Sequence, residues 1–309
     1  MAVNMAVKNI SASVLARLRN QAIQENLNYQ LCLQLFVQEE FLRRLSRSPY
    51  KENMVLKGGM FIYTLTEFKS RPTRDIDFLV KRLSNDPDGI RKVMEEICAV
   101  PTENEFITIE VVGTEQITLE KKYPGVKTRL LGKINNVRIP FSIDIGIDDV
   151  IVPDVVVRKI ATRLSDFEMP EIYTYSLEST IAEKVDAILL RMETTSRMKD
   201  FYDIYYLSGI FDFDGKILQK AILETMDHRG RTLETDTFDR IRNFPENQFL
   251  QTQWKAFTPA KEMDLSLEAA VNRLDRFIFP VLESVQKQNS FFGTWTCSNQ
   301  TWISVDTEP

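Results

Sequence analysis

The chain has 309 residues, of which 43% are apolar and 27% charged, and its formal net charge at pH 7 is −5. These values predict a globular protein with one large or two ordinary domains, and they argue against a protein that coats nucleic acid through its overall charge. No apolar run approaches the roughly 18 to 20 residues of a membrane span, and the N-terminus lacks the layout of a signal peptide. We therefore expect a cytoplasmic protein without membrane contact.

Histidine and cysteine are too scarce to support several common chemistries. His228 is the only histidine, which leaves little for Ser–His catalysis or for a multi-histidine metal site. The three cysteines, Cys32, Cys98 and Cys297, are far apart and predict neither a disulfide framework nor a zinc site. Any chemistry must then come from carboxylates, lysine and arginine.

The first half of the chain predicts helices followed by strands. Apolar periodicity indicates helices through the first fifty residues, up to Pro49. A short helix is expected from the Gly58-Gly59 pair to Leu65, and another helix from Asp86. Short apolar or alternating runs predict strands over 54–56, 75–80, 106–112, 127–134 and 137–147. Together these segments predict a mixed sheet flanked by helices.

The second half is expected to be mainly helical. A long helix follows Tyr175, with Thr180 and Glu183 spaced as a capping box. Further helical patterns cover 201–207, 216–226 and 265–285. We predict three parts, which are a core over 1–165 with an N-terminal helical arm, a helical domain over 166–290, and a flexible tail over 291–309.

Carboxylates in two predicted strands indicate a metal site. Successive residues of a strand alternate between faces, so Asp75 and Asp77 project to the same side. Two carboxylates on one face repel each other unless a cation lies between them, and Mg²⁺ prefers a few carboxylates plus substrate phosphates. Asp144 alternates with apolar neighbours in a later strand and is the expected third ligand. The sequence therefore predicts a site for Mg²⁺, with Mn²⁺ as an alternative, held by Asp75, Asp77 and Asp144.

The Gly-Gly pair after the first predicted strand suggests a triphosphate site. Without a Cβ atom, Gly58 and Gly59 would let backbone N–H groups approach phosphate oxygens closely. Alone, a Gly-Gly pair or an Asp-x-Asp pattern also fits an ordinary turn or a solvated strand edge. The order of strand, Gly-Gly, helix and Asp-x-Asp strand favours nucleotide binding. The predicted nucleotide contacts in this region are Lys57, Gly58, Gly59, Arg71, Thr73 and Arg74.

This order of motifs resembles the nucleotidyltransferase fold superfamily, although Lys57 stands where an apolar residue is usual. Two later segments, Leu177 to Asp186 and Arg197 to Tyr205, extend the likeness. With the earlier motifs they resemble the AbiEii/AbiGii-type toxin family of bacterial nucleotidyltransferases, over roughly residues 10 to 210. The resemblance implies an α+β fold, with a nucleotidyltransferase-like mixed sheet flanked by helices and a mainly α-helical C-terminal half.

The resemblance also implies that Lys184 and Asp200 belong to the catalytic site, with Lys184 contacting nucleotide phosphates. Helical periodicity places Asp200 on an apolar arc, where a carboxylate is costly unless it is paired. The alternative is a structural ion pair of Asp200 with Lys184 or Arg197 that joins two helices. Asp186 and Asp203 are predicted to be solvated or capping residues.

The activity implied by the resemblance is Mg²⁺-dependent transfer of a nucleoside monophosphate from an NTP to a hydroxyl group. The protein would be the toxin of a toxin–antitoxin or abortive-infection system, restrained by an antitoxin that is commonly a winged-helix protein. The expected acceptor is the 3′ end of tRNA, and the acid-free basic run from Lys121 to Arg138 could contact its backbone. Surface lysines also discourage edge pairing, so the run has an ordinary explanation. Alternatives are a protein or small-molecule acceptor, or NTP binding without catalysis.

Overall fold

The computed structural model describes residues 9–84, 86–117, 125–147, 149–257 and 265–304. The chain forms two compact units. The first contains the chain up to Asp148 together with Val155–Tyr175, and the second contains Asp149–Asp154 and the chain from Ser176 onward. The division therefore falls ten residues after the expected boundary at 165. Among the described residues, no helix is long and apolar enough to cross a membrane.

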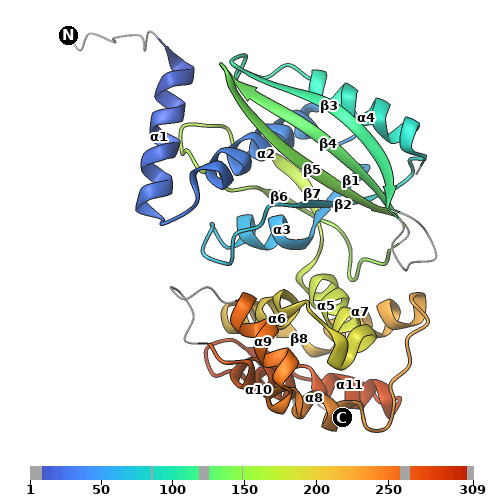
Figure 1. The fold of residues 1–309 in the computed structure, drawn as a ribbon. Coiled ribbons are helices and arrows are strands. Elements are labelled where there is room, and N and C mark those ends of the chain that lie inside the picture. The colour runs from blue at the N-terminus through green and yellow to red at the C-terminus, as the bar shows by residue number, and fades with distance from the viewer. Residues whose placement is uncertain (1–8, 85, 118–124, 148, 258–264, 305–309) are drawn as a thin grey trace. The chain divides into compact units, whose positions relative to one another are not determined.

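A mixed sheet forms the centre of the first unit (Figure 1). Within the described residues its seven strands lie in the order β3-β4-β5-β2-β1-β7-β6. Their bounds are β1 Met54–Lys57, β2 Ile76–Val80, β3 Ile107–Ile117, β4 Gly125–Ile134, β5 Val137–Ile147, β6 Val156–Lys159 and β7 Glu171–Thr174. Strand β1 is antiparallel to β2 and parallel to β7, and β2 is parallel to β5. The predicted mixed sheet is confirmed, whereas β6 and β7 were not predicted.

Helices α2 and α4 cover one face of this sheet (Figure 1). The helices of the first unit are α1 Ile10–Gln24, α2 Tyr29–Arg47, α3 Gly58–Leu65 and α4 Pro87–Ala99. Phe41 of α2 packs against Phe78 of β2, with ring centroids 6.3 Å apart. A Cβ atom on Gly132 of β4 would lie only 2.4 Å from Val37, so α2 approaches the sheet closely. Strand side chains that alternate with Phe78 and Gly132 therefore project from the other face.

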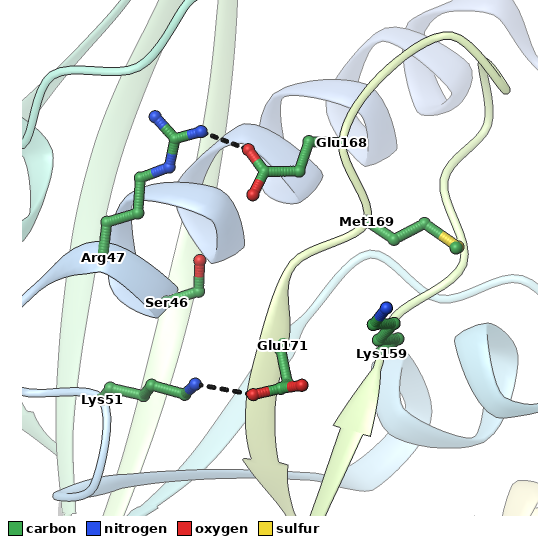
Figure 2. Close-up of a pocket in the computed structure, with 7 residues that line it drawn as sticks. All are labelled: Ser46, Arg47, Lys51, Lys159, Glu168, Met169 and Glu171. Atoms are coloured by element: carbon green, nitrogen blue, oxygen red, sulfur yellow. Dashed lines mark hydrogen bonds and ion pairs between the residues drawn. The ribbon is translucent and has the colours of Figure 1, made fainter.

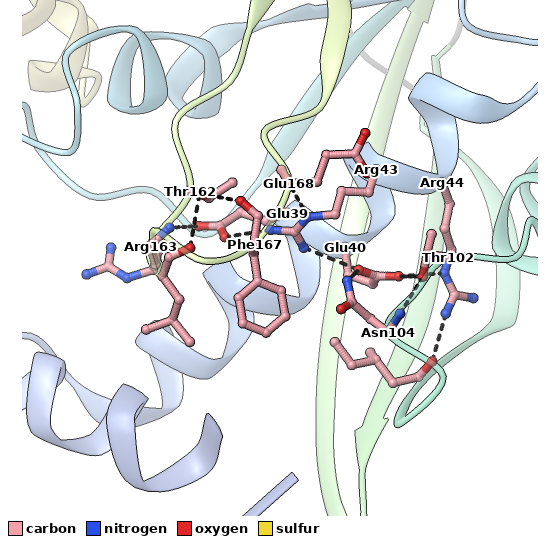
Figure 3. A network of polar contacts seen from close by, with 12 residues as sticks. Glu39, Glu40, Arg43, Arg44, Thr102, Asn104, Thr162, Arg163, Phe167 and Glu168 are labelled. Carbon is pink, nitrogen blue, oxygen red and sulfur yellow. Dashed lines mark hydrogen bonds and ion pairs between the residues drawn. The ribbon is translucent and has the colours of Figure 1, made fainter. Parts of the chain in front are cut away.

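Buried charges tie α2 to the loop before β7 (Figure 3). Glu39 Oε1 accepts a hydrogen bond from the backbone N–H of Arg163 at 3.0 Å. Arg43 lies 3.2 Å from Glu40 and donates to the carbonyl oxygen of Glu168 at 2.7 Å. Burial raises the pKa of Glu39 to about 8, because desolvation outweighs the favourable charges of Arg43 and Arg163. The network fixes α2 against the sheet.

The second unit is built mainly from helices. Its α-helices are α5 Leu177–Arg191, α6 Met198–Ile210, α7 Gly215–His228, α8 Thr237–Arg242, α9 Gln248–Phe257, α10 Leu267–Phe277 and α11 Phe279–Gln286. Short 3-10 helices cover Met192–Thr194 and Phe244–Glu246. Ser176 caps α5, since its side chain accepts from the N–H of Ser179 at 3.0 Å. The predicted capping box of Thr180 and Glu183 is therefore wrong.

The predicted flexible tail over 291–309 is wrong as far as residue 304. Strands β9 Thr294–Thr296 and β10 Thr301–Ile303 pair with each other, and β9 pairs with β8 Phe213–Asp214. Trp295 is fully buried, lies 4.7 Å from Phe277 between ring centroids, and donates a hydrogen bond to the carbonyl oxygen of Ser208. Aromatic burial therefore orders this segment. Residues 305–309 lie outside the described part of the chain.

Candidate active site

Four polar side chains form a row across the sheet of the first unit. Lys57 lies opposite Asp77, Asp77 opposite Asp144, and Asp144 opposite Lys127 in the strand register. Directly opposite residues of neighbouring strands project to the same face. Phe78, next to Asp77 in sequence, points into the core against α2. The row of Lys57, Asp77, Asp144 and Lys127, hereafter the polar row, therefore lies on the face that α2 and α4 leave open.

The third predicted carboxylate, Asp75, lies just before this row. Strand β2 begins at Ile76, so the strand predicted from Asp75 is one residue too long. The pKa of Asp144 is raised chiefly by burial, lowered by the charge of Lys127, and raised again by the charges of Asp77 and Asp75. Asp77 and Asp75 therefore both lie close enough to repel Asp144, and a cation would relieve that repulsion.

The Gly-Gly pair packs directly against the side chains of two predicted site residues. Gly58 has φ of +69°, and a Cβ atom there would lie 2.2 Å from Asp77 Oδ2. A Cβ atom on Gly59 would lie 2.8 Å from Thr73 Oγ1. Any larger residue at position 58 would displace the Asp77 carboxylate. The pair also begins α3, so its N-terminal N–H groups lie beside the polar row and suit an anionic ligand.

Helix α2 anchors the segment that carries the predicted phosphate-binding arginines. Gln34 and Gln38 both donate hydrogen bonds to the carbonyl oxygen of Arg74, at 2.6 and 2.7 Å. Arg74 itself is exposed and Arg71 is half-buried. Helix α2 therefore holds the backbone just before Asp75.

Tyr175 is a neighbour of the site that the sequence analysis did not identify. Its hydroxyl lies 3.3 Å from Lys57 Nζ, and its ring centroid lies 4.8 Å from the same ammonium. The tyrosine side chain is fully buried. Because its backbone N–H donates to the carbonyl oxygen of Leu56, the chain brings this residue beside β1 from a distant position. Tyr175 thus restrains the predicted phosphate-binding lysine.

In the second unit, Lys184 of α5 is buried beside two aspartates of α6. Its Nζ lies 2.5 Å from Asp203 Oδ2 and 3.5 Å from Asp200 Oδ1. Asp200 Oδ2 also accepts a hydrogen bond from Arg197 Nε at 2.7 Å. Both ion pairs considered for Asp200 are therefore present. The prediction that Asp203 is solvated or capping is wrong, because its side chain is 1% exposed.

Asp200 and Asp203 are three residues apart, so both lie on one side of α6. This spacing was the sequence signal that could have paired Asp203 with the same lysine as Asp200.

Asp186 is likewise not a solvated residue. It is buried and accepts hydrogen bonds from Arg229 and Arg231, both at 2.8 Å. Arg229 also pairs with Asp149 and Glu183. The sequence prediction missed this cluster because Arg229 follows Asp186 by 43 positions.

The basic run expected to contact RNA is largely neutralised where it is described. On β4, Lys127 lies 3.3 Å from Asp144, Arg129 lies 3.2 Å from Glu115, and Lys133 lies 2.7 Å from Glu110. The acidic partners come from β3 and β5, so the acid-free appearance of the run in the sequence does not persist in the sheet. Lys121 and Lys122 lie outside the described residues.

A separate hollow of about 430 Å³ is lined by residues from the end of α2, from β6 and from the start of β7 (Figure 2). The ion pairs Arg47–Glu168 and Lys51–Glu171 line it, together with Met169. It contains none of the residues predicted to bind metal or nucleotide.

The polar row fits a divalent metal, although the described ranges contain no group of three or more His, Cys, Asp and Glu side chains suited to hold an ion. Asp144 Oδ1 is buried and has no hydrogen-bond donor in that part of the chain, only the Lys127 ammonium at ion-pair distance. Asp77 lies beside it in the register. One or two carboxylates completed by substrate phosphates are a usual Mg²⁺ environment.

A mixed sheet whose neighbouring strands β2 and β5 bring Asp77 beside Asp144, next to a Gly-Gly turn, is the arrangement expected of a nucleotidyltransferase. The sequence matches the nucleotidyl transferase AbiEii toxin family of type IV toxin–antitoxin systems over residues 40–276, and the chain belongs to this family. Membership implies an NTP substrate and a cognate antitoxin. The predicted family is thus confirmed.

Two solved structures share the fold. The nucleotidyltransferase toxin MenT4 from Mycobacterium tuberculosis H37Rv is 14% identical, with a TM-score of 0.52 over 91% of this chain and 99% of its own. JHP933 from Helicobacter pylori is also 14% identical, with a TM-score of 0.50 over 85% of this chain and 96% of its own. Among curated proteins, none matches this sequence.

Proposed function

We propose that this nucleotidyltransferase moves a nucleoside monophosphate from an NTP to a hydroxyl acceptor in a Mg²⁺-dependent reaction that releases pyrophosphate. The observation that carries the proposal is the placement of Asp77 beside Asp144, with the Gly58 backbone against Asp77. Asp77, Asp144 and Asp75 would hold the ion, with Mn²⁺ as an alternative. When bound, the ion neutralises phosphate charge and lowers the pKa of an attacking hydroxyl.

The remaining residues bind and orient the nucleotide. The N–H groups at Gly58 and Gly59 approach the triphosphate, and Lys57, Arg71, Thr73 and Arg74 compensate its charge. Tyr175 keeps Lys57 in place. In the second unit, Lys184 contacts phosphates and Asp200 orients either Lys184 or the attacking hydroxyl. No covalent enzyme intermediate is required, because phosphoryl transfer depends mainly on positioning and charge stabilisation.

The proposed acceptor is the 3′ end of tRNA, and the protein acts as a cytoplasmic toxin controlled by a winged-helix antitoxin. The support is the family resemblance together with the exposed Arg138 on β5. A protein or small-molecule acceptor is the second candidate. It is favoured by the ion pairs that neutralise Lys127, Arg129 and Lys133, because these residues are less available to phosphates.

Transfer of label from each α-³²P-NTP tests the reaction. Asp77→Asn keeps the shape of the side chain beside Gly58 but removes its charge, so transfer should fall about 100-fold or more. Asp227→Asn, an exposed residue outside the candidate site, is the matched control and should retain full activity. Full activity of folded Asp77→Asn would refute the metal-site assignment.

The same assay separates the acceptors. Label in purified tRNA supports the tRNA proposal, whereas label that appears only in protein or in small molecules supports the second candidate. Absence of both label and pyrophosphate with all four NTPs and all three acceptor classes would contradict the proposed reaction.

A further inference from the structure

Lys127 is the one member of the polar row that the proposed reaction does not use. It lies on β4, opposite Asp144 in the register, and its Nζ is 3.3 Å from Asp144 Oδ1. The lysine side chain is 34% exposed and that of Asp144 is 29% exposed, so the pair lies at the sheet surface rather than in the core. The ammonium forms an ion pair with Oδ1, an atom that is itself buried although the Asp144 side chain is partly exposed.

The neighbouring cations of β4 have other partners. Arg129 pairs with Glu115, and Lys133 pairs with Glu110, both across the β3–β4 ladder. Glu115 lies opposite Lys127 in the register, yet its ion pair is with Arg129. Lys127 is thus the basic residue of this strand that is directed to a carboxylate of the candidate site.

A lysine ammonium and a divalent ion would compete for Asp144. Mg²⁺ binds carboxylate oxygen at about 2.0–2.1 Å, so an ion on Oδ1 would lie close to an ammonium that now stands 3.3 Å from that oxygen. Two cations at such a separation repel each other strongly in a partly buried site. Without a metal, the same ammonium, 3.3 Å from Asp144, offsets the repulsion of Asp144 by Asp77 and Asp75.

We propose that Lys127 is an internal counterion of the metal site, which holds Asp144 in the absence of a divalent ion and weakens metal binding until a nucleotide supplies compensating negative charge. This inference rests on the proposed function. The triphosphate attracts both the ion and the displaced ammonium, so metal and nucleotide bind with positive coupling. Lys127 thereby disfavours a metal-loaded site without substrate and is a positioning residue for Asp144.

Calorimetric titration of the full chain with Mn²⁺ tests this role without measuring activity. Lys127→Met removes the charge but keeps a flexible apolar side chain, and without nucleotide it should bind Mn²⁺ about tenfold more tightly than the original chain. Lys127→Arg keeps the charge and should bind Mn²⁺ like the original chain. Lys133→Met removes a lysine of the same strand that pairs with Glu110, and it is the matched control. With a non-hydrolysable NTP analogue present, the advantage of Lys127→Met should shrink.

The outcomes separate this inference from the proposed function. If the original chain binds Mn²⁺ and Asp77→Asn does not, but folded Lys127→Met binds with unchanged or lower affinity, the counterion role is wrong and the metal site stands. If the original chain binds no Mn²⁺ even with the NTP analogue, the metal site and the counterion role fall together. Tighter binding by both Lys127→Met and Lys133→Met would also overturn the inference, because it would reflect general surface charge.

Discussion

Gly58 has no Cβ atom, and this leaves the space that the Asp77 carboxylate occupies. Its backbone has the left-handed conformation, and a Cβ atom added to it would lie 2.2 Å from Asp77 Oδ2. Only a glycine therefore fits at this position without moving Asp77. Gly230 has a similar φ of +61°, but a Cβ atom there would meet nothing within 4 Å. Alanine substitutions at the two positions should therefore share the cost of backbone strain, and only the substitution at Gly58 should also displace Asp77.

We predict that Gly58→Ala lowers NMP transfer at least about tenfold, because a 1 Å misplacement of a reacting group is costly. Gly230→Ala should keep full activity. Both substitutions should lower the free energy of unfolding by about 1–2 kcal/mol through the left-handed φ, measured by urea denaturation. Equal activity of the two folded variants would show that the contact between Gly58 and Asp77 has no role in catalysis.

The sequence alone identified those site residues that lie together in one short motif. Asp75 and Asp77 are two positions apart in the Asp-Ile-Asp-Phe motif, and their alternation with apolar residues is visible without a structure. Lys127, Tyr175 and Asp203 were not assigned to their partners, because those partners lie in other strands or helices. A sequence pattern does not show which distant side chains become neighbours.

The long amphipathic helices and the alternating strands were predicted, and so were the short β1 and α3 on either side of the Lys57–Gly58 junction, whereas the short strands β6 and β7 were not. Strands β6 and β7 have four residues each, too few to show a period. The basic run on β4 was interpreted without β3 and β5, whose carboxylates neutralise it. The tail was expected to be flexible because its aromatic residues follow no period, although burial of Trp295 orders it.

Glu39 of helix α2 should make the stability of the fold depend on pH. Its pKa is raised from 4.5 to about 8 in the folded chain, so the folded state binds the proton more tightly than the unfolded state does. Between about pH 4.5 and pH 8 the free energy of unfolding should therefore fall as pH rises, although the charges of Arg43 and Arg163 partly offset the effect of burial on the carboxyl.

Glu39→Gln should remove this dependence while keeping an acceptor for the Arg163 N–H. We predict that the decline in unfolding free energy between pH 5 and pH 8 is smaller in Glu39→Gln than in the original chain, as measured by urea denaturation. Glu25→Gln, which alters a more exposed partner of Arg163, is the control and should keep the original decline. Identical slopes for the original chain and Glu39→Gln would contradict the raised pKa.

The predicted site residues are divided between the two units of the chain. The carboxylates and the glycines belong to the first unit, and Lys184 and Asp200 to the second. The segment Asp149–Asp154 is part of the second unit, where Arg229 pairs with Asp149 and the Ser179 hydroxyl contacts the Val152 backbone. The sequence boundary at 165 missed this arrangement, because segments apart in the chain form each unit.

Asp77 and Asp144 are proposed to hold a divalent ion beside the nucleotide. Anomalous scattering from crystals grown with Mn²⁺ and a non-hydrolysable NTP analogue tests it most directly. We predict a Mn²⁺ peak in contact with both carboxylates and with the triphosphate. A bound nucleotide whose metal lies elsewhere, or a nucleotide bound with no Mn²⁺ at these two aspartates, would show that Asp77 and Asp144 are not the metal ligands.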